Sequence, residues 1–215
     1  KLFLVASSKS KGKKLSFRGK GIEIEELENY DFSKARITFF AAGSSVAKTW
    51  VPKAAKKTVV IDNSSFLRMQ NDVPLVVPEV NSEALEKHKN IISNPNCSTI
   101  QMVLALKPLH DEYKIKRVVV STYQAVSGAG KASMDELVDQ TKKYLDDKKI
   151  SPKNFTKQIA FNLIPHIDSF SDNGYTKEEL KMTNETKKIL NSEIAVTATC
   201  VRVPVKTGHS ESINI

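Results

Sequence analysis

The chain has 215 residues, of which 40% are hydrophobic, and a formal net charge of +9 at pH 7. This length and apolar content suit one large soluble domain or two small ones. No apolar run is long enough for a bilayer span or a signal peptide, so we expect no membrane association and a cytoplasmic location. The two cysteines lack the spacing of a disulfide framework or a zinc site, and no metal is expected.

The positive charge is concentrated at the amino end. Seven of the first twenty residues are Lys or Arg and none is acidic, a pattern that would suit a polyanion such as nucleic acid. Later lysines alternate with Asp and Glu, as on a solvated helix face. Because no aromatic-interleaved basic motif accompanies the charge, we expect no nucleic acid and an anionic small molecule as the partner.

Three apolar runs in the first part of the chain end in small or polar residues. They are "LFLVAS", "ARITFFAAGSS" and "KTVVIDNSS". Short apolar strands without alternation, separated by helical or polar stretches, are typical of a parallel α/β sheet. Ligands in such sheets bind at the carboxyl ends of the strands, so we expect the three following loops to lie on one edge.

A helix is predicted to begin at Cys97, with Asn94 or Asn96 as its N-cap, and to end at Pro108. Its predicted apolar face includes Ile100, Val103, Leu104 and Leu106. The change of pattern near residue 95 predicts two domains, 1–95 and 96–215.

The rest of the second domain reads as alternating strands and helices. A strand from Arg117 to Tyr123 is followed by the loop "SGAG", and then by a helix with Ser133 as N-cap and Glu136 at the capping-box position. A second amphipathic helix follows in "YTKEELKMTNETKKIL". The stretches "AVTATCVRVPV" and "HSESINI" alternate like strands of a half-exposed antiparallel sheet.

The two cysteines have different surroundings in the sequence. A thiol in the first turn of a helix can have a lowered pKa, because the free backbone N–H groups and the helix dipole stabilise the thiolate. Cys97 fits this position, although a small buried cysteine would fit it equally. Cys200 lies inside an alternating strand and is assigned to the core.

Two polar residues near the carboxyl end are candidates for chemistry. His209 lies in a turn between two strands, where an imidazole could serve as general acid or base for a thiol. Arg202, on an otherwise apolar strand, could hold a carboxylate or phosphate, or could form a salt bridge with a neighbouring acid. The small-residue loop after Gln124 could admit a ligand close to the backbone or be a tight turn.

Four motifs together resemble the bacterial aspartate-β-semialdehyde dehydrogenases. They are "NPNCSTIQMVLALKPLH", "VVVSTYQAVSGAG", "VIDNSSFLRMQNDVPLVVPEVN" and "CVRVPVKTGHSES", and they follow the family's order and spacing along the whole chain. The resemblance implies an α/β fold, with a Rossmann-like dinucleotide-binding domain followed by an α+β catalytic and dimerisation domain. It also implies a homodimer and the NADPH-dependent conversion of L-aspartyl-4-phosphate to L-aspartate 4-semialdehyde.

The resemblance assigns roles to individual residues. Cys97 resembles the nucleophile that forms an acyl-thioester, His209 the acid/base catalyst, and Gln124 the residue that orients the acyl group. The substrate-binding residues it implies are Arg202 for the α-carboxylate, Glu178 for the α-amino group, and Arg68, Asn96 and Lys181 for the phosphate.

The cofactor implied by the resemblance is NADP. Ser7 and Lys9 would hold the ribose 2′-phosphate, where family members commonly carry Arg in place of Lys9. The nicotinamide half would lie along Ala42 and Gly43, where small residues allow close approach of the backbone, and Ser127 and Gly128 are further cofactor-binding residues that the resemblance implies. No acidic residue that would favour NAD is present in the loop after "LFLVAS".

The resemblance also implies missing parts. The family's Gly-rich pyrophosphate loop and its first strand would precede Lys1, and the last strands and terminal helix would follow Ile215. We therefore expect a fragment that lacks both ends and that is poorly active or inactive by itself. The full-length protein would serve lysine, threonine, methionine and diaminopimelate biosynthesis.

Three alternatives remain open at this stage. N-acetyl-γ-glutamyl-phosphate reductase also pairs a Cys with a His, but "STYQAVSGAG" and "KEELK" argue against it. A thiol hydrolase is a more distant possibility. A non-catalytic nucleotide- or RNA-binding module rests only on the basic amino end.

Overall fold

The computed structural model describes residues 1–215, which form two compact units. The first unit consists of Lys1–Pro74 and Leu85–Asn94, and the second of Leu75–Ala84 and Pro95–Ile215. The sequence placed all of residues 1–95 in the first domain, whereas Leu75–Ala84 packs with the second unit. This segment, which contains the short helix α2 (Pro78–Asn81), belongs to the second unit because its apolar side chains form a buried cluster with Val103 and Ile189.

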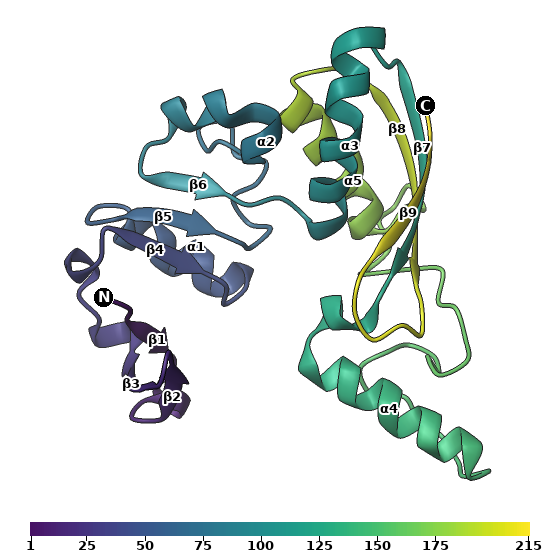
Figure 1. The fold of residues 1–215 in the computed structure, drawn as a ribbon, viewed down its shortest axis with the longest axis horizontal. Helices are drawn as coiled ribbons and strands as arrows, with labels where there is room; N and C mark the ends of the chain where they lie inside the picture. The colour runs from purple at the N-terminus through teal and green to yellow at the C-terminus, as the bar shows by residue number, and fades with distance from the viewer. The chain divides into compact units, whose positions relative to one another are not determined.

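A parallel sheet forms the larger part of the first unit (Figure 1). Its strands are β4 (Ile37–Phe40), β5 (Val59–Asp62) and β6 (Ile91–Ser93), with β5 in the middle. Helix α1 (Ser44–Ala54) connects β4 to β5 and buries one apolar face. The predicted parallel α/β arrangement is confirmed for these strands, which form a βαβ unit.

The amino-terminal run belongs to a separate sheet. Strand β1 (Leu4–Ala6) pairs in parallel with β3 (Lys20–Glu26), which also pairs antiparallel with β2 (Lys14–Phe17). The hairpin between β2 and β3 turns at Arg18 and Gly19, which have φ values of 50° and 74°. The expectation that the first apolar run joins the same sheet as β4 is therefore wrong, because the pairing of β1 is with β3.

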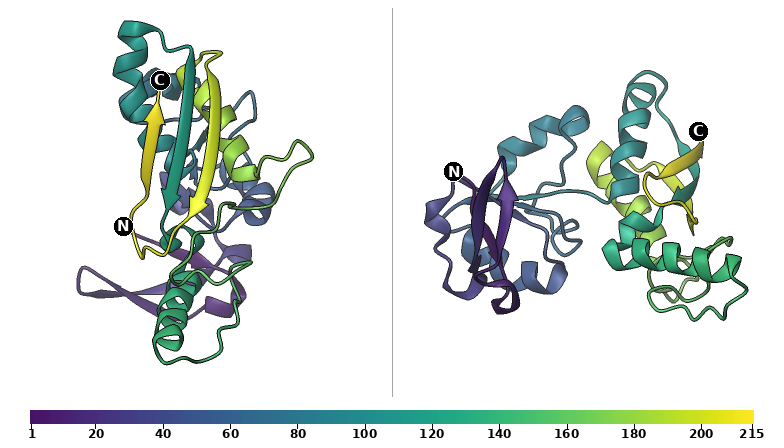
Figure 2. Two further views of the ribbon diagram at one scale, coloured as in Figure 1. Left: turned by 90° about the vertical axis from the view of Figure 1, so that its right-hand side faces the viewer. Right: turned by 60° about the horizontal axis from the view of Figure 1, so that its bottom comes forward.

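A three-stranded mixed sheet forms the frame of the second unit. Its strands are β7 (Arg117–Gln124), β8 (Ala195–Arg202) and β9 (Ser210–Asn214), and β7 lies between the other two (Figure 2). Strand β8 is parallel to β7 and β9 is antiparallel to it. The prediction that the two carboxyl-terminal strands belong to an antiparallel sheet is confirmed for β9. The prediction is wrong for β8, because the helices between β7 and β8 carry the chain back to the starting end of the sheet and make these two strands parallel.

Helices α3 (Cys97–Tyr113) and α5 (Lys177–Leu190) pack against this sheet. Helix α3 does not end at Pro108 as predicted, since losing one backbone donor weakens a helix without always stopping it. It ends at Tyr113, and Lys114, whose φ is 54°, is its C-cap. Val103 and Leu106 are buried as predicted, whereas Leu104, predicted on the same face, is 47% exposed, and Met102 is fully buried.

Helix α4 (Lys131–Leu145) begins before the predicted Ser133, because Gly130 at φ 93° allows the earlier entry. The predicted capping box is absent. Glu136 instead accepts hydrogen bonds from the backbone N–H groups of Lys153 and Asn154 at 2.8 and 2.7 Å, and so holds the following loop against the helix.

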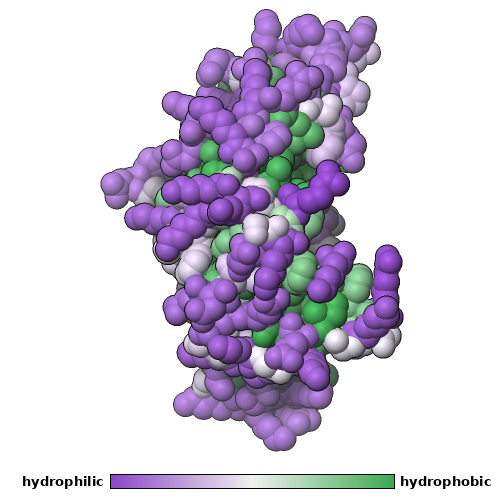
Figure 3. Space-filling view, turned by 90° about the vertical axis from the view of Figure 1, so that its left-hand side faces the viewer, coloured by the Kyte–Doolittle hydropathy of each residue, from purple (hydrophilic) through white to green (hydrophobic).

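Helix α5 was predicted correctly, and it begins with a capping box between Thr176 and Glu179. None of the helices is long and apolar enough to cross a membrane. In the view of Figure 3, hydrophilic side chains cover most of the visible face, with hydrophobic side chains showing between them.

Candidate active site

The Glu178 carboxylate is the centre of a hydrogen-bonded cluster in the second unit. One carboxylate oxygen accepts from the Asn96 side-chain amide at 2.8 Å and from the Gln124 amide at 3.4 Å, and the other accepts from the Lys181 ammonium at 3.1 Å. The partners come from the start of α3, the end of β7 and the first turns of α5. Four residues that the sequence singled out are therefore in direct contact, around a carboxylate that is only 5% exposed.

Asn96, one of the two predicted N-caps, caps α3. Its side-chain oxygen accepts from the N–H groups of Ser98 and Thr99 at 3.0 and 3.3 Å, and its own N–H donates to Glu185 at 2.6 Å. Both ends of the Asn96 amide are thus used, one in the cap and one on Glu178. A phosphate that binds Asn96 would have to compete with Glu178 for this donor.

Cys97 is the first residue of α3, and its side chain is exposed. The prediction that this thiol has a lowered pKa overall is wrong. The surrounding protein raises the pKa of the thiol above its ordinary value, and the Glu178 carboxylate raises it further. The backbone N–H groups of Cys97 and Ser98 at the helix start do lower the pKa of the thiol, but burial and the negative charge of Glu178 outweigh them.

Cys200 confirms the core assignment made from the sequence. Its side chain is fully buried among apolar residues of the sheet and of α5, and its sulfur lies 3.7 Å from that of Met182. Burial raises the pKa of this thiol to about 12. Cys97 is therefore the accessible thiol of the pair.

Arg202 and His209 meet at one backbone residue, Ala125. The Arg202 guanidinium donates to the Ala125 carbonyl at 2.8 Å, and the Ala125 N–H donates to Nδ1 of His209 at 3.1 Å. Arg202 forms no salt bridge, so the alternative interpretation of this residue is not supported. Burial lowers the pKa of His209, and the positive charge of Arg202 lowers it further.

The loop after β7 fits closely around these two side chains. A Cβ atom on Gly128 would lie 3.1 Å from Nε2 of His209 and 3.3 Å from Nη1 of Arg202. Only glycine leaves both side chains their present positions. The loop "SGAG" therefore touches the candidate catalytic groups, while its predicted contact with a cofactor stays a prediction.

Arg202 also lines a cavity of about 260 Å³. Ala129, His166 and Asp168 form part of the same wall. Asp168 accepts from Lys181 at 3.0 Å, so Lys181 is held between the carboxylates of Asp168 and Glu178. These neighbours raise the pKa of Lys181, against the opposing effect of its burial, and keep it charged.

Sequence reasoning missed three residues of this site. Ala125 contributes only its backbone, so its side chain carries no signal. Asp168 lies in an irregular segment, where no periodicity indicates a role. Glu185 could have been found, because it is two helical turns from Glu178 on the buried side of α5, where a second acid needs a polar partner.

Arg68, the third predicted phosphate ligand, belongs to the first unit. It is 7% exposed, and its guanidinium donates to the carbonyl of Asn63 at 3.1 Å.

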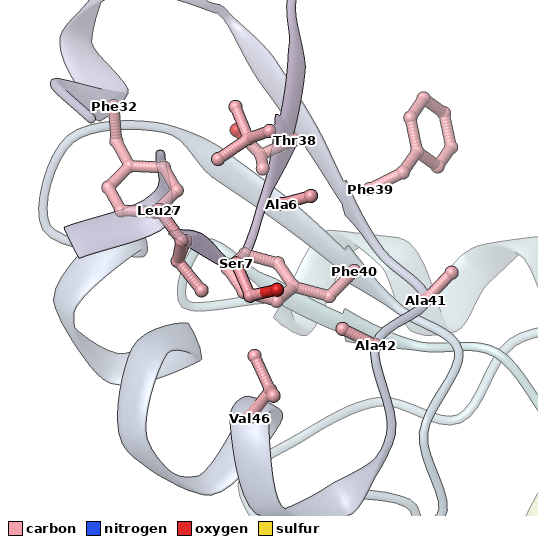
Figure 4. A pocket seen from close by; sticks show the side chains of 11 residues that line it. Ala6, Ser7, Leu27, Phe32, Thr38, Phe39, Phe40, Ala41, Ala42 and Val46 are labelled. Atoms are coloured by element: carbon pink, nitrogen blue, oxygen red, sulfur yellow. The ribbon is translucent and has the colours of Figure 1, made fainter. Parts of the chain in front are cut away.

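A pocket of about 510 Å³ lies in the first unit, at the carboxyl ends of β1 and β4. Figure 4 shows Ser7, Phe40, Ala42 and Val46 gathered around the same space. No charged side chain lines it. Gly43, with φ 86°, follows directly and leads into α1, and Lys9 lies exposed two residues after Ser7. The structure contains no group of three or more His, Cys, Asp or Glu residues placed to bind a metal ion.

Comparison with known proteins identifies the family. The family model described as "Semialdehyde dehydrogenase, dimerisation domain" matches residues 106–215, and "Semialdehyde dehydrogenase, NAD binding domain" matches residues 1–88. The chain belongs to the semialdehyde dehydrogenase family. The description of residues 1–88 as an NAD binding domain agrees with the uncharged pocket among the strand ends of the first unit.

Individual members of the semialdehyde dehydrogenase family are similar to this chain in sequence and in structure. The aspartate-semialdehyde dehydrogenase of Shewanella sp. (strain DB6705) is 54% identical over 100% of this chain and 65% of its own length. The crystal structure of aspartate semialdehyde dehydrogenase II complexed with ASA from Vibrio cholerae is 52% identical, with a TM-score of 0.96, over 98% of this chain and 64% of that one. The resemblance stated from the motifs is confirmed.

A more distant semialdehyde dehydrogenase structure was solved with NADP. This protein, from Candida albicans, is 28% identical with a TM-score of 0.73, over 99% of this chain and 62% of its own. The chain thus spans slightly less than two thirds of the length of these three relatives.

Proposed function

We propose that the protein containing this chain catalyses the NADPH-dependent reductive dephosphorylation of L-aspartyl-4-phosphate to L-aspartate 4-semialdehyde. The observation that carries the proposal is the cluster around Glu178, which joins the start of the Cys97 helix to Gln124 and Lys181. The similarity to proteins named aspartate-semialdehyde dehydrogenase supports it. We further propose a cytoplasmic location and a role in lysine, threonine, methionine and diaminopimelate biosynthesis.

The charges of this site complement those of the substrate. Arg202, free of any acidic partner, can bind the α-carboxylate with two parallel hydrogen bonds. The Glu178 carboxylate can accept the α-ammonium group, and Lys181 can provide the positive charge for the phosphate, with Asn96 as an amide donor. Arg68 is proposed as a further phosphate ligand from its motif.

Cys97 would act as the nucleophile. Its sulfur forms a bond to the acyl carbon as phosphate leaves, which produces an acyl-thioester, and Gln124 orients the acyl group beside Glu178. Because Glu178 raises the pKa of this thiol, a substrate ammonium that neutralises Glu178 would favour the reactive thiolate.

NADP is the proposed cofactor, and it supplies or accepts the hydride. The pocket in the first unit fits a dinucleotide in three respects, because its lining is mostly apolar, it lies at strand ends, and no acid lines it. Ser7, Ala42 and Gly43 would contact the cofactor there, and the exposed ammonium of Lys9 would face the 2′-phosphate. Ser127 and Gly128 are proposed as further cofactor-binding residues.

A homodimer is also proposed. The sheet face of β7, β8 and β9 that carries Val119, Ser121, Tyr123, Thr197 and Thr199 is uncharged at these positions and is not covered by the helices that bury the other face. Such a surface suits a second copy of the same sheet. The family description of this part as a dimerisation domain supports the proposal.

The function is tested with the full-length protein containing this chain. We expect reduction of NADP in the presence of L-aspartate 4-semialdehyde, with a strict requirement for inorganic phosphate. N-acetylglutamate semialdehyde is the competing substrate. Activity on that compound, with none on aspartate semialdehyde, would contradict the proposal and favour the related reductase.

A further inference from the structure

The ammonium of Lys181 is shared by two carboxylates that come from different segments of the second unit. It donates to Oε2 of Glu178 at 3.1 Å, on the same helix, and to Oδ2 of Asp168 at 3.0 Å, in the irregular segment before α5. An ammonium group has three hydrogens, so one remains for a ligand. The Glu178 side chain is buried, whereas that of Asp168 is 38% exposed. Lys181 therefore lies between a buried carboxylate and a partly exposed one.

The proposed substrate changes this arrangement at Glu178. Its α-ammonium group would bind the Glu178 carboxylate, so it would take an acceptor from Lys181 and bring a second positive charge beside it. Like charges in such close proximity disfavour each other. The ion pair of Lys181 with Glu178 is therefore expected to weaken on substrate binding, and the pair with Asp168 is the one that remains.

The segment around Asp168 is fastened to the start of α5. The Lys177 N–H donates to the Ser169 carbonyl at 2.9 Å. Asp168 has φ 69°, a left-handed conformation that is uncommon outside glycine and that Asp tolerates better than most residues. The Ser169 N–H donates to Oδ1 of Asp168 at 2.8 Å, which leaves Oδ2 for Lys181. Asp168 is thus tied to the helix that carries Lys181 through the backbone as well as through the ion pair.

The charges around Lys181 show why a second carboxylate is needed there. Burial lowers the pKa of Lys181, while Glu178 and then Asp168 raise it, and the net result lies above the ordinary value. The charged groups that act on Lys181 are these two carboxylates, and Lys177 on α5 is a second cation that acts on Asp168. Once a substrate ammonium neutralises Glu178, Asp168 is the carboxylate left to oppose the effect of burial.

Asp168 also lies beside the proposed substrate-binding arginine. Asp168 and Arg202 both line the cavity of about 260 Å³. Arg202 is the proposed partner of the substrate α-carboxylate. An ammonium that is held by Asp168 therefore stays next to the space in which the substrate would be bound.

Building on the proposed function, we propose that Asp168 is a positioning residue which keeps the Lys181 ammonium ordered and charged for the substrate phosphate while the α-ammonium occupies Glu178. Without this second carboxylate, the long flexible stem of Lys181 would be free to move once Glu178 is taken. Asp168 also brings a negative charge toward the phosphate, but this carboxylate is partly exposed and screened by solvent. The loss of an ordered ammonium removes a direct contact, so the net effect of Asp168 is to favour phosphate binding.

The proposal is tested with Asp168→Asn in the full-length protein, assayed with L-aspartate 4-semialdehyde, inorganic phosphate and NADP. Asn tolerates the left-handed backbone as Asp does, and it removes the charge at almost constant shape. We expect KM for phosphate to rise about tenfold, as for the loss of one charge-assisted contact, with kcat and KM for the semialdehyde changed by about twofold at most.

The matched control is Asp135→Asn, which breaks an exposed ion pair of 2.6 Å with Lys131 on α4. It should leave all three kinetic parameters unchanged. An unchanged or lowered KM for phosphate in Asp168→Asn, or an equal change of all its parameters, would overturn the proposal.

A double-mutant cycle shows whether Asp168 acts through Lys181. Lys181→Ala should raise KM for phosphate at least as much as Asp168→Asn does. Adding Asp168→Asn to Lys181→Ala should then leave this KM unchanged or lower it, because only the repulsion between Asp168 and phosphate remains to be removed. A further rise as large as that in the wild-type background would show that Asp168 acts independently of Lys181, and would contradict the proposal.

The pH dependence of KM for phosphate is a readout that a purely structural role of Asp168 would not change. In Asp168→Asn with the semialdehyde bound, neither carboxylate opposes burial, so the pKa of Lys181 should fall below its ordinary value. KM for phosphate should therefore begin to rise at a lower alkaline pH in this variant than in the wild type. The same pH profile in both proteins would overturn the proposal.

The effect of Asp168 on Lys181 can also be measured without turnover. In full-length protein labelled with ¹³C-lysine, the Lys181 side-chain signal is assigned by its loss in Lys181→Arg, and its titration gives the pKa. We expect a lower pKa of Lys181 in Asp168→Asn than in the wild type, and no change in Asp135→Asn. An equal pKa in Asp168→Asn and the wild type would overturn the proposal. A wild-type protein without activity would contradict the proposed function instead, and this titration would still decide whether Asp168 holds Lys181.

Discussion

The pocket of the first unit is lined mostly by apolar side chains and by no charged one, whereas the site of the second unit brings two carboxylates, an ammonium, a guanidinium and an imidazole together. The first kind of site recognises a ligand by shape and by close approach of the backbone. The second depends on charges that must each keep a partner once they are buried. Substitutions in the second unit should therefore affect turnover, and those in the first unit should affect cofactor affinity.

The largest loss of turnover is expected from substitution of Cys97, and substitution of Cys200 is its control. Cys97→Ser should lower turnover about 10³-fold or more, because a hydroxyl at this exposed position is a far weaker nucleophile. Cys200→Ser, in the core beside Met182, should change turnover only a fewfold. Steady-state kinetics of both variants measure the difference. Similar losses in the two would mean that Cys97 has no special chemical role.

A large effect is also expected from the loop beside His209. Gly128→Ala places a methyl group 3.1 Å from Nε2 and 3.3 Å from Nη1 of Arg202, so both side chains must shift. We expect kcat/KM to fall about 10²-fold, since small displacements of positioned groups are costly in catalysis. Gly21→Ala is the matched control, because its Cβ would find no atom closer than 4.0 Å. Normal kinetics of Gly128→Ala would show that the position of His209 is not critical.

In the first unit, we expect that replacing Lys9 weakens the binding of NADP severalfold and leaves the binding of NAD unchanged. Lys9→Ala should raise KM for NADP about five- to tenfold, as the loss of one charge-assisted contact would, and should leave KM for NAD unchanged. Lys11→Ala is the control, because Lys11 is already paired with Glu26 at 2.8 Å. A parallel rise of KM for both cofactors would remove Lys9 from the 2′-phosphate site.

The smallest effect concerns stability and Glu211 on β9. Burial raises the pKa of this carboxyl to about 7, against the opposing influence of Gln101. Folding therefore favours the protonated form, so the stability from this group is complete below the ordinary value near 4.5 and is lost as the pH rises through about 7. Glu211→Gln should raise Tm at pH 8 by about 2–4 °C, the shift that ~1 kcal/mol gives in a protein of this size.

The same substitution should change Tm less at pH 5.5, where Glu211 is already protonated in the folded protein. Thermal unfolding monitored by circular dichroism at both pH values measures this. An equal change at pH 5.5 and pH 8 would show that titration of Glu211 does not contribute.

Hydrophobic pattern was sufficient to predict the strands β4, β5, β7 and β8, because buried strands are apolar along their length or alternate clearly. It missed the hairpin of β2 and β3, whose lysines and glutamates look like a solvated segment. The pairing partner of β1 and the continuation of α3 past Pro108 depend on tertiary contacts, which a local pattern does not contain.

The residues of the candidate active site could likewise be predicted only in part from the sequence. Motifs identified Asn96, Gln124, Glu178 and Lys181, which the structure connects by hydrogen bonds. The raised pKa of Cys97 could not be predicted from its helix position, because it depends on burial by the surrounding fold and on the Glu178 carboxylate that α5 brings from far along the chain. The contribution of Ala125 was invisible for a different reason, since any residue type offers the same backbone N–H and carbonyl.

The central claim is that Cys97 forms the acyl-thioester in a site organised by Glu178. The most direct measurement is mass spectrometry of the full-length protein after rapid mixing with L-aspartyl-4-phosphate in the absence of NADPH. We predict one aspartyl group attached to the peptide that contains Cys97, present in Cys200→Ser and absent in Cys97→Ala. An adduct at another residue, or no adduct in a protein that is fully active when NADPH is supplied, would contradict the claim.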